Sequence, residues 1–437
     1  MKPNINMMLL LVLTACLLGA CKNEPILNPN APTMDEIIKN PTVNELNNLV
    51  VGTESGMRKG LDFYTEITGI FGREIYRFAA SEPRYTQEMM GAGNSQLDNT
   101  SFYANNSWLY RYNVVRNAYL LIEGTQNSTY ITNEKQKKGY YGFAKTIIAY
   151  QLLLNLNLTY ANGIRTDVKD FRKLGPIVKE EQALTDIAAM LKAAREDLAD
   201  GEFLFELSDG FTGFKDIAGF TKFNYALAAR VAIYRKQWAE ALTDLQGSFL
   251  DLAGDLNTGA YHIFSTAAHD ITNPAFYERN ESGDIRLAHP SYAAQIAPGD
   301  DRIDKTALRD DPATKDGLTS DRDFWIYRSE TAPAAIIRNE ELILIYAEAK
   351  IQLNQLPDGK TAIDRIRKAH NLAPYGGALD QAPLITEMLT QRRFSLYGEG
   401  HRWVDMRRYN RLATLPIDRP NDDVWPQLPL PLAEVGN

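Results

Sequence analysis

The sequence predicts a mainly α-helical protein in which tetratricopeptide-type helical hairpins form a scaffold, interrupted by a loop-rich excursion with short strands. Three observations favour this fold class. Apolar residues recur at helical spacing through most of the chain. Small residues stand where paired helices would cross, as in tetratricopeptide hairpins. The stretch from about 254 to 333 lacks the helical period and holds five glycines and five prolines.

The first 20 residues are predicted to be a lipoprotein signal peptide. Residues 7–18 form an apolar run that is too short to cross about 30 Å of hydrocarbon and is typical of a signal-peptide core. The run ends in Leu18-Gly19-Ala20-Cys21, which resembles a bacterial lipobox. We therefore expect Cys21 to be the lipid-carrying first residue of the mature chain, anchored in a membrane by its acyl groups. Cys16 and an ordinary secretory signal are the alternatives.

Helices are expected wherever the apolar period is sustained. The clearest example places Trp108, Tyr112, Val115, Tyr119 and Ile122 on one face. The expected helices cover 108–123, 138–160, 185–198, 224–234, 238–250, 338–353, 361–370 and 385–397, and the last one stops at Gly398. We expect the mature chain, 21–437, to form a single domain.

Two regions are not expected to be helical. Within the excursion, a short strand is predicted over 324–327. The stretch 415–437 contains five prolines and is predicted to wrap the surface without a helix, because proline breaks helix interiors.

The sequence contains no specific catalytic motif. Its five histidines form no close metal-ligand pair, and no phosphate-binding loop or nucleophile elbow is present. Cys16 and Cys21 are the only cysteines, so the body holds no disulfide or thiolate centre. Asp300, Asp301 and Asp304 offer oxygen ligands suited to calcium, but their spacing is not that of an EF-hand. The sequence therefore predicts no enzyme activity, cofactor or metal. The net charge of −8 argues against a nucleic-acid partner.

Several segments together resemble the SusD/RagB family of Bacteroidota outer-membrane lipoproteins. The matching segments are the Cys21 lipobox with Asn28-Pro29-Asn30-Ala31-Pro32-Thr33, Trp108-Leu109-Tyr110 through Leu121-Ile122, Ala228-Ala229-Arg230 through Tyr234, Asp301-Arg302, Ile337-Arg338-Asn339-Glu340-Glu341-Leu342, Ala362-Ile363-Asp364-Arg365-Ile366-Arg367, Gly398-Glu399-Gly400-His401-Arg402-Trp403 through Arg408, and Pro429-Leu430-Pro431. They follow the family's order over nearly the whole chain. Gln391 departs from the pattern, because the family usually has an acidic residue there.

The turn around Gly398 and Gly400 is predicted to carry an ion network that belongs to the scaffold. Its members would be the charged residues that alternate in sign there, with Trp403 packed beneath them. These charged residues are Arg393, Glu399, Arg402, Asp405 and Arg407.

The resemblance implies a surface-exposed, lipid-anchored nutrient-binding protein of the outer membrane that acts with a SusC-like TonB-dependent transporter. Glycans are the expected cargo, and peptides are the alternative, as in the RagB branch. A helical extracellular glycoside hydrolase and a purely structural scaffold protein are further alternatives. Sugar rings stack on aromatic side chains, so the candidate ligand contacts are the aromatic residues least explained by helical spacing. They are Tyr85, Tyr103, Phe276, Tyr277, Tyr292 and Trp325; for Trp325, packing inside the expected strand is the stronger interpretation.

Overall fold

The computed structural model describes residues 38–435, and 51% of the chain is helix and 10% is strand. The mainly helical fold class is therefore confirmed. The predicted signal peptide and Cys21 lie outside the described residues, so they stay predictions, as does the single-domain organisation. Among the described residues, no helix is both long and apolar enough to cross a membrane.

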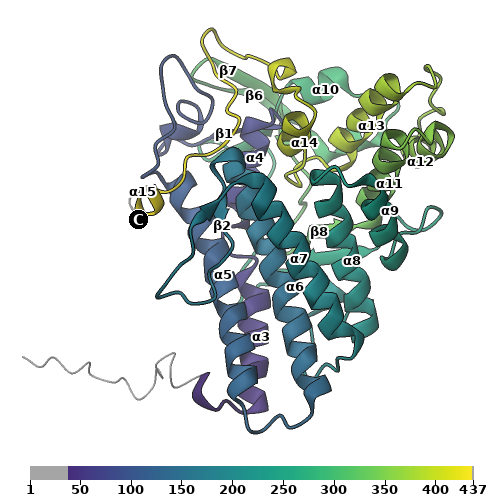
Figure 1. The fold of residues 1–437 in the computed structure, drawn as a ribbon. Coiled ribbons are helices and arrows are strands. Elements are labelled where there is room, and N and C mark those ends of the chain that lie inside the picture. The colour runs from purple at the N-terminus through teal and green to yellow at the C-terminus, as the bar shows by residue number, and fades with distance from the viewer. Residues whose placement is uncertain (1–37, 436–437) are drawn as a thin grey trace, which may run out of the picture.

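Long helices packed side by side form one half of the molecule (Figure 1). They are α3 (Val43–Gly56), α5 (Phe102–Asn127), α6 (Glu134–Thr159) and α7 (Glu180–Ala199). Helix α6 lies between α5 and α7, and every residue from Phe143 to Thr159 except Lys145 is buried. Because this part of α6 is buried on all sides, it is a core helix and not an amphipathic surface helix.

Shorter helices form the other half. Helices α8 (Ile217–Tyr234) and α9 (Trp238–Gly247) pair, as do α11 (Asn339–Gln352) and α12 (Leu356–Ala369), with α13 (Gln381–Ser395) packed against the second pair. Both predicted pairs are therefore present. Helix α12 begins five residues earlier than predicted, because Pro357 occupies its first turn, where the missing N–H costs nothing.

The remaining short elements connect these helices and the sheets. They are α4 (Leu61–Phe71), β2 (Ile164–Arg165), β3 (Ile177–Val178), α10 (Ser291–Gln295), α14 (Arg402–Arg408) and the 3₁₀ turns Pro83–Tyr85, Tyr160–Asn162, Asp209–Phe211, Asp301–Lys305 and Leu412–Thr414.

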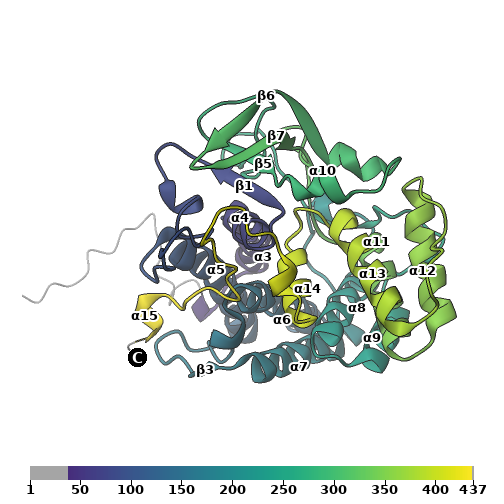
Figure 2. The same ribbon diagram turned by 90° about the horizontal axis from the view of Figure 1, so that it is seen from above.

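The excursion is more ordered than predicted. An antiparallel sheet has the order β1 (Ile75–Phe78), β5 (Ile285–Ala288), β7 (Leu318–Phe324) and β6 (Thr306–Lys315), and it forms one edge of the molecule in Figure 2. A second sheet pairs β4 (Gly259–His262) with β8 (Ala334–Arg338). The predicted strand over 324–327 is wrong, because β7 ends at Phe324. The missed signal is Asp316-Gly317, whose positive φ angles of 51° and 81° make the two-residue turn that joins β6 to β7.

The outer edge of β6 is blocked along part of its length. Arg279 donates to the carbonyl of Leu308 at 3.1 Å, and the side-chain oxygen of Asn280 accepts from the amide of Asp310 at 2.9 Å. Pro312 removes one further amide donor from this strand. Side chains and proline thus occupy positions that a further strand would need for pairing.

The C-terminal segment from 415 crosses back over the long helices. Its backbone amides at Asp423, Leu428 and Leu432 donate to the carbonyls of Met90, Leu158 and Asn99. The prediction that this segment contains no helix is wrong, because Leu432–Val435 forms a short helix, α15. Pro431 directly precedes α15, and proline is compatible with a helix start.

The ion network around Gly398 exists, but most of its partners come from other elements. Asp405 accepts from Arg392 at 2.6 Å and from Arg408 at 2.7 Å, and Glu399 pairs with Arg338 at 2.8 Å. Trp403 is fully buried beneath the turn, as predicted. The other three predicted members bond to neutral groups: Arg393 to Ser291, Arg402 to the Gly72 carbonyl, and Arg407 to the Pro426 and Asn157 carbonyls.

Candidate functional site

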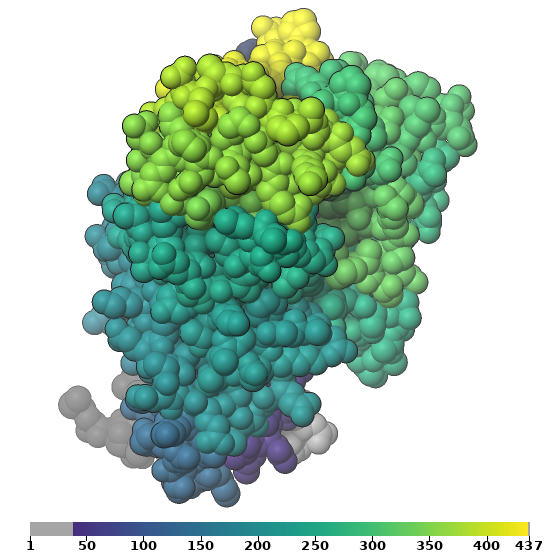
Figure 3. Space-filling view, turned by 90° about the vertical axis from the view of Figure 1, so that its right-hand side faces the viewer, coloured from purple at the N-terminus to yellow at the C-terminus, as the bar shows by residue number. Residues whose placement is uncertain are grey.

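A recess of about 250 Å³ lies where the excursion meets the second helical half. Figure 3 shows this face, on which the surface is hollowed between the green excursion and the yellow-green helices. We call it the Trp325 recess, and its walls come from the end of β7, from β4 and β8, and from the start of α11. Its lining includes Asn257, Tyr261, Asp304, Lys305, Trp325, Tyr327, Arg328, Arg338, Glu340, His370, Tyr397 and Glu399.

Aromatic rings form part of the wall of the Trp325 recess. Trp325 is half-buried, with the ring of Phe276 at 6.3 Å and the guanidinium of Arg279 at 5.8 Å from its centroid. Tyr261 on β4 is also half-buried, and burial raises the pKa of its phenol to about 12. Two partly exposed rings beside hydrogen-bonding groups can accept the apolar face of a sugar or a flat side chain.

The floor of the recess carries buried charges that are mutually compensated. Arg338 pairs with Glu399 at 2.8 Å and also with Glu340. Arg338 lowers the pKa of Glu340 well below its usual range, against the effect of burial. Burial lowers the pKa of Lys305 to about 8, and its ammonium donates to the carbonyl of Ser395. Both carboxylates are ion-paired with Arg338, so the floor is suited to hydrogen bonding.

His370 joins three elements at the rim of the recess. Its Nδ1 lies 2.7 Å from a carboxylate oxygen of Asp301, and its Nε2 lies 2.7 Å from one of Glu340. His370 thus ties the end of α12 to the turn before β6 and to the start of α11.

The predicted aspartate group is only partly assembled. Asp300, Asp301 and His370 bring possible ligand atoms within 4.8 Å of one another, with His370 in the place expected for Asp304. Both oxygens of Asp300, however, accept from Arg302, at 2.8 and 2.6 Å. Asp300 is therefore ion-paired with Arg302, and Asp301 lies in contact with His370.

Three of the six aromatic candidates are core residues. Tyr85 donates its hydroxyl to Glu66 at 3.0 Å, and Tyr292 donates to the Arg302 carbonyl at 2.8 Å. Tyr103 was counted among the residues not explained by helical spacing, but it lies in the first turn of α5 and is fully buried. Their hydroxyls already bond within the protein, and their rings pack in the interior.

The other three candidates lie nearer the surface. Trp325 lines the recess and Phe276 packs beside it. Tyr277 is half-buried between the guanidinium groups of Arg77 and Arg286, at 4.8 and 4.5 Å from its ring centroid. The structure therefore brings Trp325 and Phe276 together. Sequence reasoning missed Tyr261, Lys305 and His370, which reach the recess from distant parts of the chain.

A second recess, of about 570 Å³, lies on the outer side of the first sheet. Its walls are the loop 280–283 and the residues 309–315 of β6, and the aromatic ring in its lining, Phe78, is 3% exposed. This recess is wider than the Trp325 recess but offers a ligand no exposed ring on which to stack.

Comparison with known proteins identifies the fold. Residues 316–423 match the sequence profile of the SusD family. A SusD superfamily protein from Bacteroides vulgatus superposes with a TM-score of 0.66 at 14% identity, over 90% of this chain and 96% of that one. One from Parabacteroides distasonis gives 0.67 at 15% identity, over 89% and 96%. The surface glycan-binding protein A from Bacteroides uniformis gives 0.66 at 14%, over 84% and 88%.

These similarities define the fold class of the protein. The chain has the SusD fold over most of its length, and the SusD/RagB resemblance drawn from the sequence is confirmed. No curated protein matches the chain in sequence.

Proposed function

We propose that the protein captures oligosaccharides at the cell surface and acts with a SusC-like TonB-dependent transporter in their uptake across the outer membrane. The observation that carries the proposal is the Trp325 recess, which combines half-buried rings with buried, compensated polar groups. The fold shared with a surface glycan-binding protein supports the same cargo class. Binding of this kind requires no covalent chemistry and no cofactor.

A peptide cargo is the alternative, and one feature of the fold weighs against it. Extended peptides are commonly bound by adding a strand to an open sheet edge. Here the edge strand β6 is occupied by Arg279 and Asn280 and interrupted by Pro312. The β6 edge of this sheet is thus poorly suited to strand addition.

We expect Trp325→Ala to weaken oligosaccharide binding about tenfold or more, because it removes the stacking surface and the contact area of the indole. Calorimetric titration with a panel of neutral β- and α-linked oligosaccharides measures the effect, and thermal unfolding checks that the fold is retained. Tyr130→Ala is the matched control, because Tyr130 is 60% exposed on the α5–α6 loop, outside the recess. Unchanged affinity in Trp325→Ala, or binding of extended peptides in place of sugars, would contradict the proposal.

Membrane attachment is proposed to depend on Cys21. Cys21→Ala removes the thiol that carries the lipid, so this variant is expected to move from the membrane fraction to the soluble fraction. The second candidate is tested by Cys16→Ala, which should stay in the membrane. Fractionation of both variants by centrifugation distinguishes the two positions, and membrane retention of Cys21→Ala would show the assignment to be wrong.

A further inference from the structure

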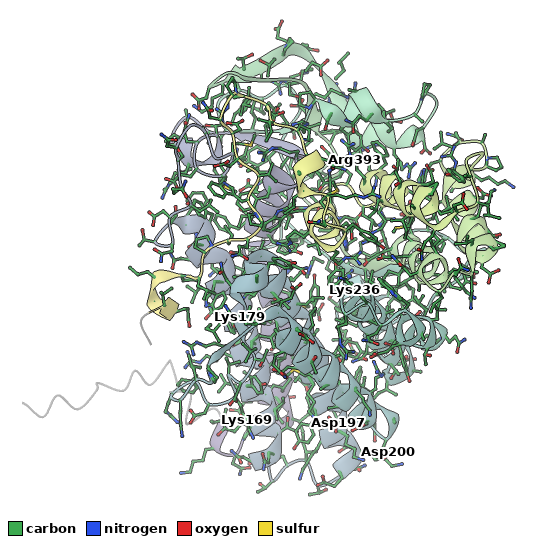
Figure 4. All side chains as sticks on the ribbon, turned by 45° about the horizontal axis from the view of Figure 1, so that its top comes forward. Lys169, Lys179, Asp197, Asp200, Lys236 and Arg393 are labelled. Carbon is green, nitrogen blue, oxygen red and sulfur yellow. The ribbon has the colours of Figure 1, made fainter. Side chains whose placement is uncertain are left out.

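A separate cavity of about 570 Å³ opens between the start of α7, the α8–α9 turn and the end of α14. We call it the Arg407 cavity. The residues that matter for the argument are Tyr160, Glu180, Tyr234, Lys236, Arg407 and Arg408. None of them lines the Trp325 recess. Figure 4 labels Lys179, just before α7, and Lys236, in the α8–α9 turn, which carry positive charge on two sides of this region.

Arg407 is a buried cation without a carboxylate partner. Its two terminal nitrogens donate to the carbonyls of Pro426 at 3.0 Å and Asn157 at 2.5 Å. Among the described residues, no carboxylate oxygen forms an ion pair with it, whereas the neighbouring Arg408 pairs with Glu348 and Asp405, both at 2.7 Å. Burial lowers the pKa of Arg407 to about 10. An anion entering the cavity would supply the missing countercharge.

Lys236 adds a second positive charge at the mouth of the cavity. It is exposed, it has a left-handed φ of 58°, and it forms no ion pair among residues 38–435. The facing acidic residue is Glu180, the first residue of α7, whose pKa is raised by burial in spite of Arg407 and Lys236. Among the described residues, Arg407 and Lys236 therefore face the carboxylates of Glu180 and Glu181 without forming an ion pair with either.

The cavity also presents aromatic rings. The guanidinium of Arg407 lies between Tyr160 and Trp403, at 4.6 and 4.0 Å from their centroids, and that of Arg408 lies 5.0 Å from the centroid of Tyr234. Tyr160 and Tyr234 both line the cavity. Rings beside paired donors and acceptors are the chemistry that recognises sugar rings.

We propose that the Arg407 cavity is a second ligand site, which binds a hexuronate residue of an acidic oligosaccharide. The sugar carboxylate lies between Arg407 and Lys236, and the ring lies against Tyr160. Glu181 accepts hydrogen bonds from sugar hydroxyls, and the charge of Glu180 and Glu181 disfavours a dianionic phosphate. A single carboxylate on a hydroxyl-rich ring is therefore the ligand that fits both kinds of wall.

The test compares trigalacturonate with its fully methyl-esterified form, which keeps the rings and removes the charge. Calorimetric titration of the mature chain is expected to show at least tenfold tighter binding of the acid, with an affinity that falls between 50 and 300 mM NaCl because the contact is ionic. Equal binding of acid and ester, or no binding of the acid at 10 mM, would overturn the proposal.

Variants at the mouth of the cavity locate the site. Arg407 is left intact because it packs the scaffold. Lys236→Asn keeps the left-handed turn and is expected to weaken trigalacturonate binding about fivefold, whereas Glu180→Gln, which removes a repulsive carboxyl, is expected to strengthen it. Lys169→Asn removes an exposed charge outside the cavity and is the control. Trp325→Ala should leave trigalacturonate binding unchanged, which separates this site from the first one. If Lys236→Asn and Glu180→Gln both bind as the wild type does, the assignment is wrong.

Discussion

Glu341→Ala is expected to destabilise the protein by about 3–5 kcal/mol, because it leaves the buried Arg230 without its anion. Glu341 on α11 accepts from Arg230 on α8 through both oxygens, at 2.7 and 2.6 Å, and its side chain is 1% exposed. Burial opposes ionisation of Glu341, but Arg230 outweighs it and lowers the pKa of Glu341 to about 2. This pair holds the two helical hairpins together.

Urea unfolding at pH 7 measures the loss, and two controls define its cause. Glu134→Ala breaks an ion pair whose carboxylate is 74% exposed, so it should change the free energy of unfolding by less than about 0.5 kcal/mol. The double variant Arg230→Met, Glu341→Leu removes both charges and should recover most of the loss. If Glu341→Ala is no worse than Glu134→Ala, the pair does not have the predicted role.

Glu74 is expected to make stability fall as the pH rises. It is 2% exposed between α4 and β1, and burial raises its pKa from 4.5 to about 7, although Arg402 and Arg393 oppose the rise. The folded state thus holds a proton that the unfolded state releases. The contribution of Glu74 is complete below pH 4.5 and is lost as the pH rises through about 7, a loss on the order of 3 kcal/mol.

A comparison with Glu74→Gln isolates this effect from other groups. Burial lowers the pKa of His262 to about 3 and of His401 to about 4, so both histidines contribute stability above pH 6.5 that is lost as the pH falls. These histidine contributions cancel in the difference between wild type and Glu74→Gln. That difference should fall by about 3 kcal/mol between pH 4.5 and 8, and a constant difference would contradict the assignment.

Local patterns predicted helices α5 to α9 and α11 to α13 because each helical period is contained in its own stretch of sequence, whereas α3, α4, α10 and α14 were not predicted. The β6–β7 hairpin was missed because Asp310, Asp311 and Asp321 make both of its faces polar, so no alternation marks it. Tyr103 was misplaced for a related reason. It follows the polar stretch 93–101, but the fold places it in the first turn of α5, where it is buried.

The sites depend on contacts that no local pattern encodes. Arg230 and Glu341 both occur in segments that resemble the SusD family, yet their pairing spans 111 residues. The Trp325 recess likewise draws Tyr261, Lys305 and His370 from three different elements. Trp325 was singled out from the sequence because it lies outside the helical spacing, and its role as a ligand contact stays a prediction. The ion pairs in the floor of the recess could not be predicted, because the fold, and not the local sequence, brings Arg338 to Glu399.

The contacts of the C-terminal segment with the long helices determine the order in which parts of the molecule can fold. Residues 423–432 supply hydrogen-bond donors to carbonyls at positions 90, 99 and 158, and Glu434 pairs with Arg165 at 2.6 Å. During synthesis the N-terminal part of the chain appears first, so the long helices α3, α5, α6 and α7 can form early. The carbonyls at positions 90, 99 and 158 stay uncovered until residues 423–432 have been made. Native closure is therefore a late, non-local event. Until the C-terminal segment docks, the partly folded chain exposes apolar surface of the kind that chaperones bind.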